Sequence, residues 1–164
     1  MQHDFIVDPL DLPAVPDHLL IPVNQLATSG LTEVPLKKLD GTIQDSSVYK
    51  IFQAPDSLVN WLKTIFDFEF EAEYIWMTGW SYKHRDLGRT VAYNYLLDAG
   101  GENIITEFYD NQFDNVATMS IVMPLHKWYR LNVSLPHMVL AREPNKLGTR
   151  CILSITPLQS KFDY

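Results

Sequence analysis

The chain has 164 residues, and we expect one domain over residues 1–164 with a sizeable core. Its 46% hydrophobic and 20% charged residues are typical of a folded globular protein and argue against disorder. The formal net charge of −7 argues against a nucleic-acid partner, because binding a polyanion normally needs a basic surface. Cys151 is the single cysteine, which excludes a disulfide within the chain.

The N-terminal residues predict neither a secretory signal nor a membrane anchor. Asp4 and Asp8 stand where a signal peptide would have a basic start followed by a long apolar run. No run of about 18 apolar residues occurs elsewhere in the sequence. We therefore expect a soluble cytoplasmic protein without a membrane partner.

Residues 1–67 are expected to form an extended and helical support for the rest of the domain. Four prolines between Phe5 and Val23 prevent a helix of normal length, so this segment is predicted to run extended. His18, which lies among these prolines, is predicted to be a surface residue. Asp40-Gly41 predicts a turn further along the chain.

An amphipathic helix is predicted from Asp56 to about Phe66. Asp56 and Ser57 supply an N-cap, and the residues that follow carry an apolar stripe at helical spacing. The stripe consists of Leu58, Trp61, Leu62 and Ile65. We expect it to pack against the outer face of a sheet.

From Phe68 the apolar period changes to two, which predicts a strand with one buried and one wet face. The three glutamates on its polar face, Glu69, Glu71 and Glu73, are predicted to be solvated. Further strands are predicted at Thr90–Leu97, Ile104–Tyr109, Ala117–Met123, Trp128–Val133 and Arg150–Ile155, with turns at Asp98–Gly101 and Asn145–Gly148. One helix followed by many short strands predicts a closed or two-sheet β core, over residues 68–157.

His84 and Asp86 are two residues apart in a segment flanked by predicted strands, so both side chains would leave the same face. Far downstream, His137 offers a third ligand. Two imidazoles and one carboxylate are the donor set of the non-haem Fe(II) oxygenases. His126 competes as third ligand, but it lies beside Lys127 in a predicted exposed loop, and we prefer His137.

The order His84-Arg85-Asp86, His137, Arg150 resembles the HxD…H…R series of the Fe(II)/2-oxoglutarate-dependent dioxygenases. The stretch YNYLLDAGGENIITEFY resembles the strand, Gly-Gly turn and strand that follow HxD in the prolyl-hydroxylase-like members. The resemblance covers about half of the chain. It implies a mainly β fold with a flanking helix, the double-stranded β-helix or jelly roll of cupin-like proteins. It also implies that His84, Asp86 and His137 hold Fe(II) and form the catalytic centre.

The same resemblance implies 2-oxoglutarate as cosubstrate, with Arg150 holding its distal carboxylate and Asn94 and Thr106 lining its pocket. The implied reaction hydroxylates an unactivated C–H bond of a peptidyl or small-molecule substrate. Position 152 is Ile152, where the family often has Ser or Thr.

Two alternatives stay open at this point. One is a cupin-like metal-binding module, or pseudo-enzyme, that keeps the fold without turnover. The other is a structural β-sandwich in which the three ligands never meet. Arg89 and Arg142 flank the motifs in sequence, and we expect both to be solvated.

Overall fold

The structure, a computed structural model, describes residues 5–37, 42–44, 48–78, 81–143 and 148–161. Its strands are β1 (Val7–Leu10), β2 (Glu33–Val34), β3 (Leu36–Lys37), β4 (Ile43–Gln44), β5 (Tyr49–Gln53), β6 (Phe70–Thr78), β7 (Val91–Asp98), β8 (Ile104–Phe108), β9 (Met119–Ile121), β10 (Trp128–Asn132), β11 (His137–Ala141) and β12 (Thr149–Pro157). One α-helix, α1 (Asp56–Leu62), and 3-10 helices at Asp17–Leu19, Val23–Thr28 and Leu158–Ser160 complete the described part. The predicted turn at Asp40-Gly41 and most of the turn at Asn145–Gly148 lie outside the described residues.

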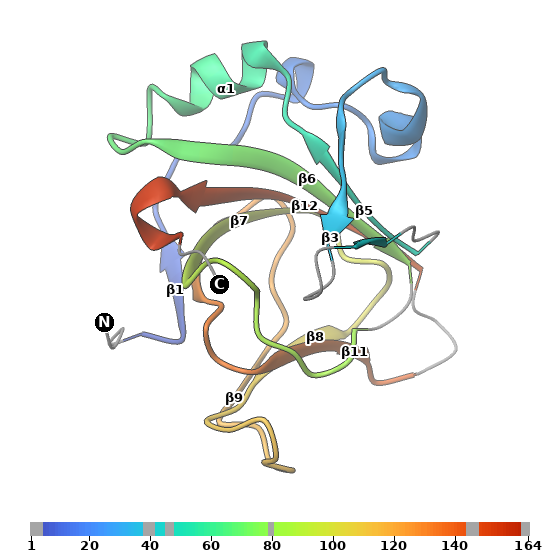
Figure 1. Ribbon diagram of the computed structural model, residues 1–164, viewed down its shortest axis with the longest axis vertical. Coiled ribbons are helices and arrows are strands. Elements are labelled where there is room, and N and C mark those ends of the chain that lie inside the picture. The colour runs from blue at the N-terminus through green and yellow to red at the C-terminus, as the bar shows by residue number, and fades with distance from the viewer. Residues whose placement is uncertain (1–4, 38–41, 45–47, 79–80, 144–147, 162–164) are drawn as a thin grey trace.

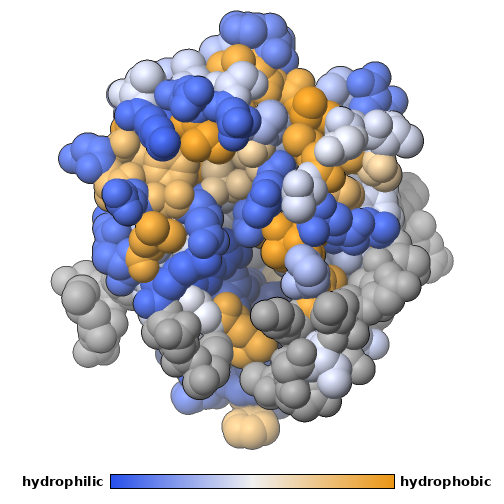
Figure 2. Space-filling view, turned by 45° about the horizontal axis from the view of Figure 1, so that its top comes forward, coloured by the Kyte–Doolittle hydropathy of each residue, from blue (hydrophilic) through white to orange (hydrophobic). Residues whose placement is uncertain are grey.

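Two antiparallel sheets face each other (Figure 1). The larger has seven strands in the order β1-β10-β7-β12-β6-β5-β2, and the smaller has three in the order β11-β8-β9. Strands β3 and β4 pair separately. The molecule is hollowed on the face that Figure 2 shows, among hydrophilic and hydrophobic groups. The prediction of a mainly β jelly roll with one flanking helix is confirmed.

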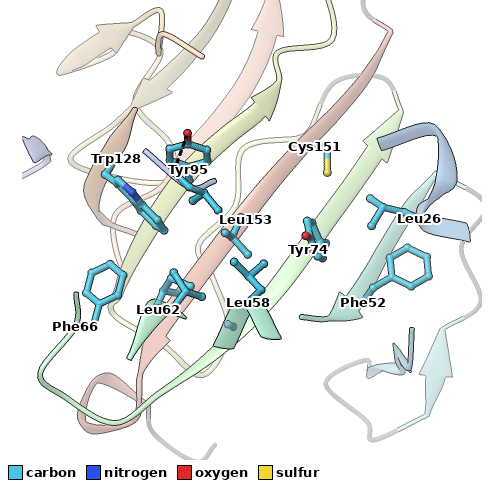
Figure 3. Close-up of a cluster of buried hydrophobic side chains, with 13 residues drawn as sticks. Leu26, Phe52, Leu58, Leu62, Phe66, Tyr74, Tyr95, Trp128, Cys151 and Leu153 are labelled. Atoms are coloured by element: carbon cyan, nitrogen blue, oxygen red, sulfur yellow. Dashed lines mark hydrogen bonds between the residues drawn. The ribbon is translucent and has the colours of Figure 1, made fainter. Parts of the chain in front are cut away.

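Helix α1 covers the outer face of the seven-stranded sheet, as its apolar stripe predicts (Figure 1). Leu58 and Leu62 are fully buried there against Tyr74 and Leu153 of the sheet (Figure 3). The predicted N-cap is wrong, because Pro55 occupies the cap position and no side chain caps the helix. The proline side chain has no oxygen that could accept from the first amides of the helix, so the helix begins without a side-chain capping bond. Among the described residues, no helix is long and apolar enough to cross a bilayer.

Alternation along the strands separates this outer core from a second core between the sheets. On β6, Ala72 and Tyr74 face α1, so Glu73 and Ile75 face the space between the sheets. The second core joins β7 and β10 of the large sheet to β8 of the small one. Its buried members are Ala92, Leu96, Phe108, Met123, Tyr129, Leu131, Val133 and Ile152.

The five strands predicted after residue 90 all form, as β7, β8, β9, β10 and β12. Their ends differ from the prediction by up to a few residues. Strand β11, which follows Pro136, and the short strands β2 to β5 were not predicted. Strands β1, β2 and β5, from the first part of the chain, join the large sheet.

The predicted turn at Asp98–Gly101 joins β7 to β8 and requires glycine. Gly100 has a φ of +83°, and a Cβ there would lie 3.2 Å from the carbonyl oxygen of Gly148 and 3.3 Å from that of Thr149. Asp98 accepts a hydrogen bond from the Gly100 amide at 2.9 Å. This close approach holds the turn against the start of β12.

We expect Leu62→Ala to lower the free energy of unfolding by about 2–5 kcal/mol, because it opens a cavity under α1. Ser57→Ala, at an exposed position of the same helix that makes no capping bond, should change it by less than about 0.5 kcal/mol. Urea unfolding followed by far-ultraviolet circular dichroism measures both. Equal stabilities of the two variants would contradict the packing of α1 described above.

Candidate metal centre

His84 and His137 lie side by side because their backbones form an antiparallel bridge. The His84 amide donates to the His137 carbonyl at 2.9 Å, and the His137 amide donates to the His84 carbonyl at 2.8 Å. Directly opposed residues in an antiparallel pair carry their side chains on the same face. The ring centroids of these two imidazoles are therefore only 4.5 Å apart.

Asp86 completes a group of three ligands. Its Oδ1 lies 3.6 Å from His84 Nε2 and 3.3 Å from His137 Nε2. The three ligand atoms all lie within 4.8 Å of one another, close enough to hold one metal ion. The His137 and Asp86 side chains are 11% and 16% exposed, whereas that of His84 is 46% exposed. The group is thus reached from solvent on the His84 side.

Both imidazoles are oriented through their Nδ1 atoms. His84 Nδ1 lies 2.6 Å from the Tyr82 carbonyl oxygen, and His137 Nδ1 lies 2.9 Å from the Leu135 carbonyl oxygen. A carbonyl oxygen only accepts, so each Nδ1 carries a proton and donates. In the neutral imidazole, Nε2 then keeps its lone pair free, which is the state that binds a metal.

Asp86 is held in the ionised form by Arg89. Burial by itself would raise the pKa of the Asp86 carboxyl, but the adjacent Arg89 guanidinium and His137 outweigh it and lower that pKa well below its usual range. Arg89 Nε donates to Asp86 Oδ2 at 2.7 Å, and Arg89 Nη2 forms an ion pair with the same oxygen at 2.7 Å. Oδ1 is left facing the two histidines.

The expectation that Arg89 is solvated is wrong. Its side chain is 16% exposed, and its Nη1 donates to Ser154 Oγ at 3.0 Å and to Thr156 Oγ1 at 2.8 Å on β12. The spacing of Asp86 and Arg89, three residues apart, is the sequence signal that could have indicated the pair. Arg142 is exposed, as predicted.

Arg150 is buried, with 2% of its surface exposed, and is incompletely hydrogen-bonded. Its Nη1 lies 3.4 Å from the Ala99 carbonyl oxygen and its Nη2 lies 3.5 Å from Thr106 Oγ1, both long contacts, while its buried Nε has no partner within the described residues. Burial lowers the pKa of the guanidinium to about 10, which Asp98 partly opposes. A buried guanidinium with an unused donor is able to bind an anion.

One cavity of about 380 Å³ is lined by all six residues singled out from the sequence. They are His84, Asp86, Asn94, Thr106, His137 and Arg150. Asn94 Oδ1 accepts a hydrogen bond from Ser154 Oγ at 2.7 Å, and Thr106 is 4% exposed. The remaining wall is mostly apolar, with Phe108, Leu131 and Val139 among its members.

His126 lies elsewhere. It is exposed, has a φ of 56° and stacks on Tyr95 with ring centroids 5.9 Å apart. Tyr95 belongs to the core on the outer face of the sheet, so His126 is on the side away from the cavity. His18 is exposed, as predicted.

A second hollow, a groove of about 710 Å³, adjoins the three ligands. Glu71 and Glu73 of β6 line it, together with Tyr49 of β5. Glu69 and Glu71 are exposed, but the prediction of solvation is wrong for Glu73, which is half-buried. The acidic face of β6 looks toward the space between the sheets, whereas its aromatic face packs under α1.

The structure resembles solved jelly-roll proteins at low sequence identity. An oxidoreductase of the 2OG-Fe(II) oxygenase family from Burkholderia pseudomallei has 10% identity and a TM-score of 0.51, over 78% of this chain and 73% of that one. A prolyl hydroxylase from Trichoplax adhaerens, in complex with a hypoxia inducible factor peptide fragment, has 14% identity and a TM-score of 0.51, over 82% and 74%. Vicilin from Corylus avellana has 11% identity and a TM-score of 0.45, and the match covers 70% of this chain and 30% of the vicilin.

No protein-family model matches the sequence, and no curated protein matches it. The two oxygenase structures therefore establish a shared fold. The chain has the fold of these oxygenases, together with a His-Asp-His group close enough to bind a metal.

We expect Arg89→Met to weaken metal binding by about 10- to 100-fold near neutral pH, because Asp86 loses the partner that orients it. Burial would then raise the pKa of the Asp86 carboxyl, so the affinity of the variant should fall more steeply than that of the wild type between about pH 7 and pH 5. Titration with Co(II), followed by its visible absorption, measures both effects. Arg142→Met, at an exposed arginine, is the matched control and should bind as the wild type does.

Proposed function

We propose that the chain is an Fe(II)- and 2-oxoglutarate-dependent oxygenase that hydroxylates an unactivated C–H bond. The observation that carries this proposal is the buried, under-bonded guanidinium of Arg150 in the same cavity as His84, Asp86 and His137. A metal site alone would suit many cupin-like proteins. A cation buried beside the metal site, with an N–H donor that has no partner, suits a particular kind of cosubstrate. Such a cosubstrate chelates a metal at one end and carries a carboxylate at the other.

The donor set fits Fe(II). His84 and His137 each present a free Nε2, and Asp86 is ionised at neutral pH, as ferrous iron requires. Three protein ligands leave other coordination positions for a cosubstrate and for O2. Fe(II) held by these three residues, with 2-oxoglutarate and O2, would supply the oxidising chemistry that the amino acids lack, with succinate and CO2 as coproducts.

The residues of this chain would bind and orient 2-oxoglutarate and exclude water from the reacting groups. Arg150 would hold the distal carboxylate of 2-oxoglutarate through charge-assisted hydrogen bonds, with Thr106 beside it as a further donor. Asn94 Oδ1 accepts from Ser154, so its amide N–H groups would be the donors to the same ligand. Phe108, Val139 and their apolar neighbours would keep the reacting groups away from bulk water.

A metal-binding module of the same fold, without turnover, is the second candidate. It is favoured by Ile152, which lines the cavity two residues after Arg150 and offers no hydroxyl. In this case iron would bind at the three ligands while 2-oxoglutarate would not. The titration below separates the two candidates.

We expect anaerobic addition of 2-oxoglutarate to the Fe(II)-loaded protein to give the weak visible charge-transfer band of a chelated keto acid. His137→Ala should abolish the band together with metal binding, whereas His126→Ala, at a histidine outside the cavity, should leave both unchanged. Iron bound at one per chain without any band would support the module without turnover.

We expect Arg150→Met to weaken 2-oxoglutarate binding by about tenfold or more, since a charged hydrogen bond contributes about 1.5–3 kcal/mol. Metal affinity should remain, because Arg150 is not among the metal ligands. The metal-free variant should be no less stable than the wild type, since an incompletely paired buried charge is costly. Equal 2-oxoglutarate affinities of the variant and the wild type would remove this role of Arg150.

A further inference from the structure

The groove beside the candidate metal centre shares part of its lining with the cavity that contains Arg150. Both hollows are lined by Tyr49, Ile75, Ser81, His84, Asp86 and Arg89. On β12, Arg150 lies four residues before Ser154 and six before Thr156, the two hydroxyls that hold Arg89. A strand advances about 3.3 Å per residue, so these hydroxyls are displaced along the sheet from Arg150, toward the groove.

Glu73 is a polar group of this groove to which the described residues supply no partner. It is half-buried on β6, opposite Ser154 of β12 in the strand register. Within the described ranges, no hydrogen bond or ion pair is made by its carboxylate. Burial raises the pKa of the Glu73 carboxyl, and Arg89 opposes that rise.

The nearby donors are already engaged. Arg89 donates one hydrogen bond each to Asp86, Ser154 and Thr156, and its Nη2 forms an ion pair with Asp86. The Ser154 hydroxyl donates to Asn94. Lys161, the other cation lining the groove near Glu73, is paired with Glu71. A half-buried carboxylate that receives no hydrogen bond from the described residues can accept one from a ligand.

We propose that this groove binds the oxygenase substrate and that Glu73 recognises a cationic nitrogen on it, an ammonium or a guanidinium group. The inference rests on the proposed function, because it places the carbon to be oxidised beside His84 and Asp86. Ile51, Ile75 and Leu36 offer apolar contacts to the hydrocarbon part of such a substrate. The net charge of −7 favours the approach of a cation.

The test compares cationic probes with neutral probes of the same length by isothermal titration calorimetry. Hexylamine and hexanol form the small-molecule pair, and a blocked Gly-Lys-Gly peptide and its Nε-acetylated form are the peptide pair. Each is titrated into the wild type, Glu73→Gln and Glu69→Gln, with and without Fe(II) and 2-oxoglutarate under anaerobic conditions. Glu69→Gln makes the same change of charge at an exposed glutamate just before β6.

At least one cationic probe should bind the wild type and Glu69→Gln about tenfold or more tightly than its neutral partner. Glu73→Gln should lose that preference. Binding of hexylamine would indicate a small amine as substrate, and binding of the lysine peptide would indicate a peptide side chain. Equal binding of cationic and neutral probes, an unchanged preference in Glu73→Gln, or no binding of any cationic probe would overturn the inference.

The same samples separate this inference from the proposed function. A charge-transfer band without a preference for the cationic probes would keep the oxygenase and remove the role of Glu73. A preference that depends on Glu73, without a band, would keep the cation site and remove the oxygenase.

Discussion

The ion pair between Asp86 and Arg89 is the interaction on which the candidate site depends. The segment that carries His84 and Asp86 joins β6 to β7 as an irregular connection, so few ladder hydrogen bonds fix it. Arg89 joins it to the large sheet through Ser154 and Thr156 of β12, while the backbone bridge to His137 joins it to the small sheet. A single guanidinium thus orients a candidate metal ligand and links it to the longest strand pairing among the described residues, that of β12 with β6.

The large sheet separates two environments with opposite requirements. Its outer face is covered by α1 and the N-terminal segment, and the side chains there form a dry aromatic and aliphatic core. Its inner face carries Arg150, Glu73 and the hydroxyls of Ser154 and Thr156, which need hydrogen bonds. The outer core stabilises the sheet, so the inner face can hold polar groups that weaken it.

Arg150 and Glu73 illustrate this cost in complementary ways. Each is a charged group removed at least partly from water. Arg150 Nε is buried without a partner among the described residues, and a buried charge of this kind is costly unless a ligand completes it. The Glu73 carboxylate, which is half-buried, makes no hydrogen bond or ion pair among the described residues. A buried cation in the cavity and an unpaired carboxylate in the adjoining groove would give two neighbouring binding regions of opposite preference, an anionic cosubstrate in one and a cationic substrate in the other.

The sequence by itself determined the helix stripe and five of the strands after residue 90, because periodicity decides which side chains share a face. The six site residues that line the cavity were indicated by the resemblance of the HxD…H…R series to a known family, not by periodicity. Contacts between residues far apart in the sequence were decided only by the tertiary structure. The register of β11 against the His84 segment and the burial of Arg89 under β12 depend on partners many residues away. Alternation along β6 likewise predicts two faces but not which one turns toward the cavity, since that depends on where α1 packs. Glu73 was therefore assigned to solvent, although the fold turns it toward the metal centre.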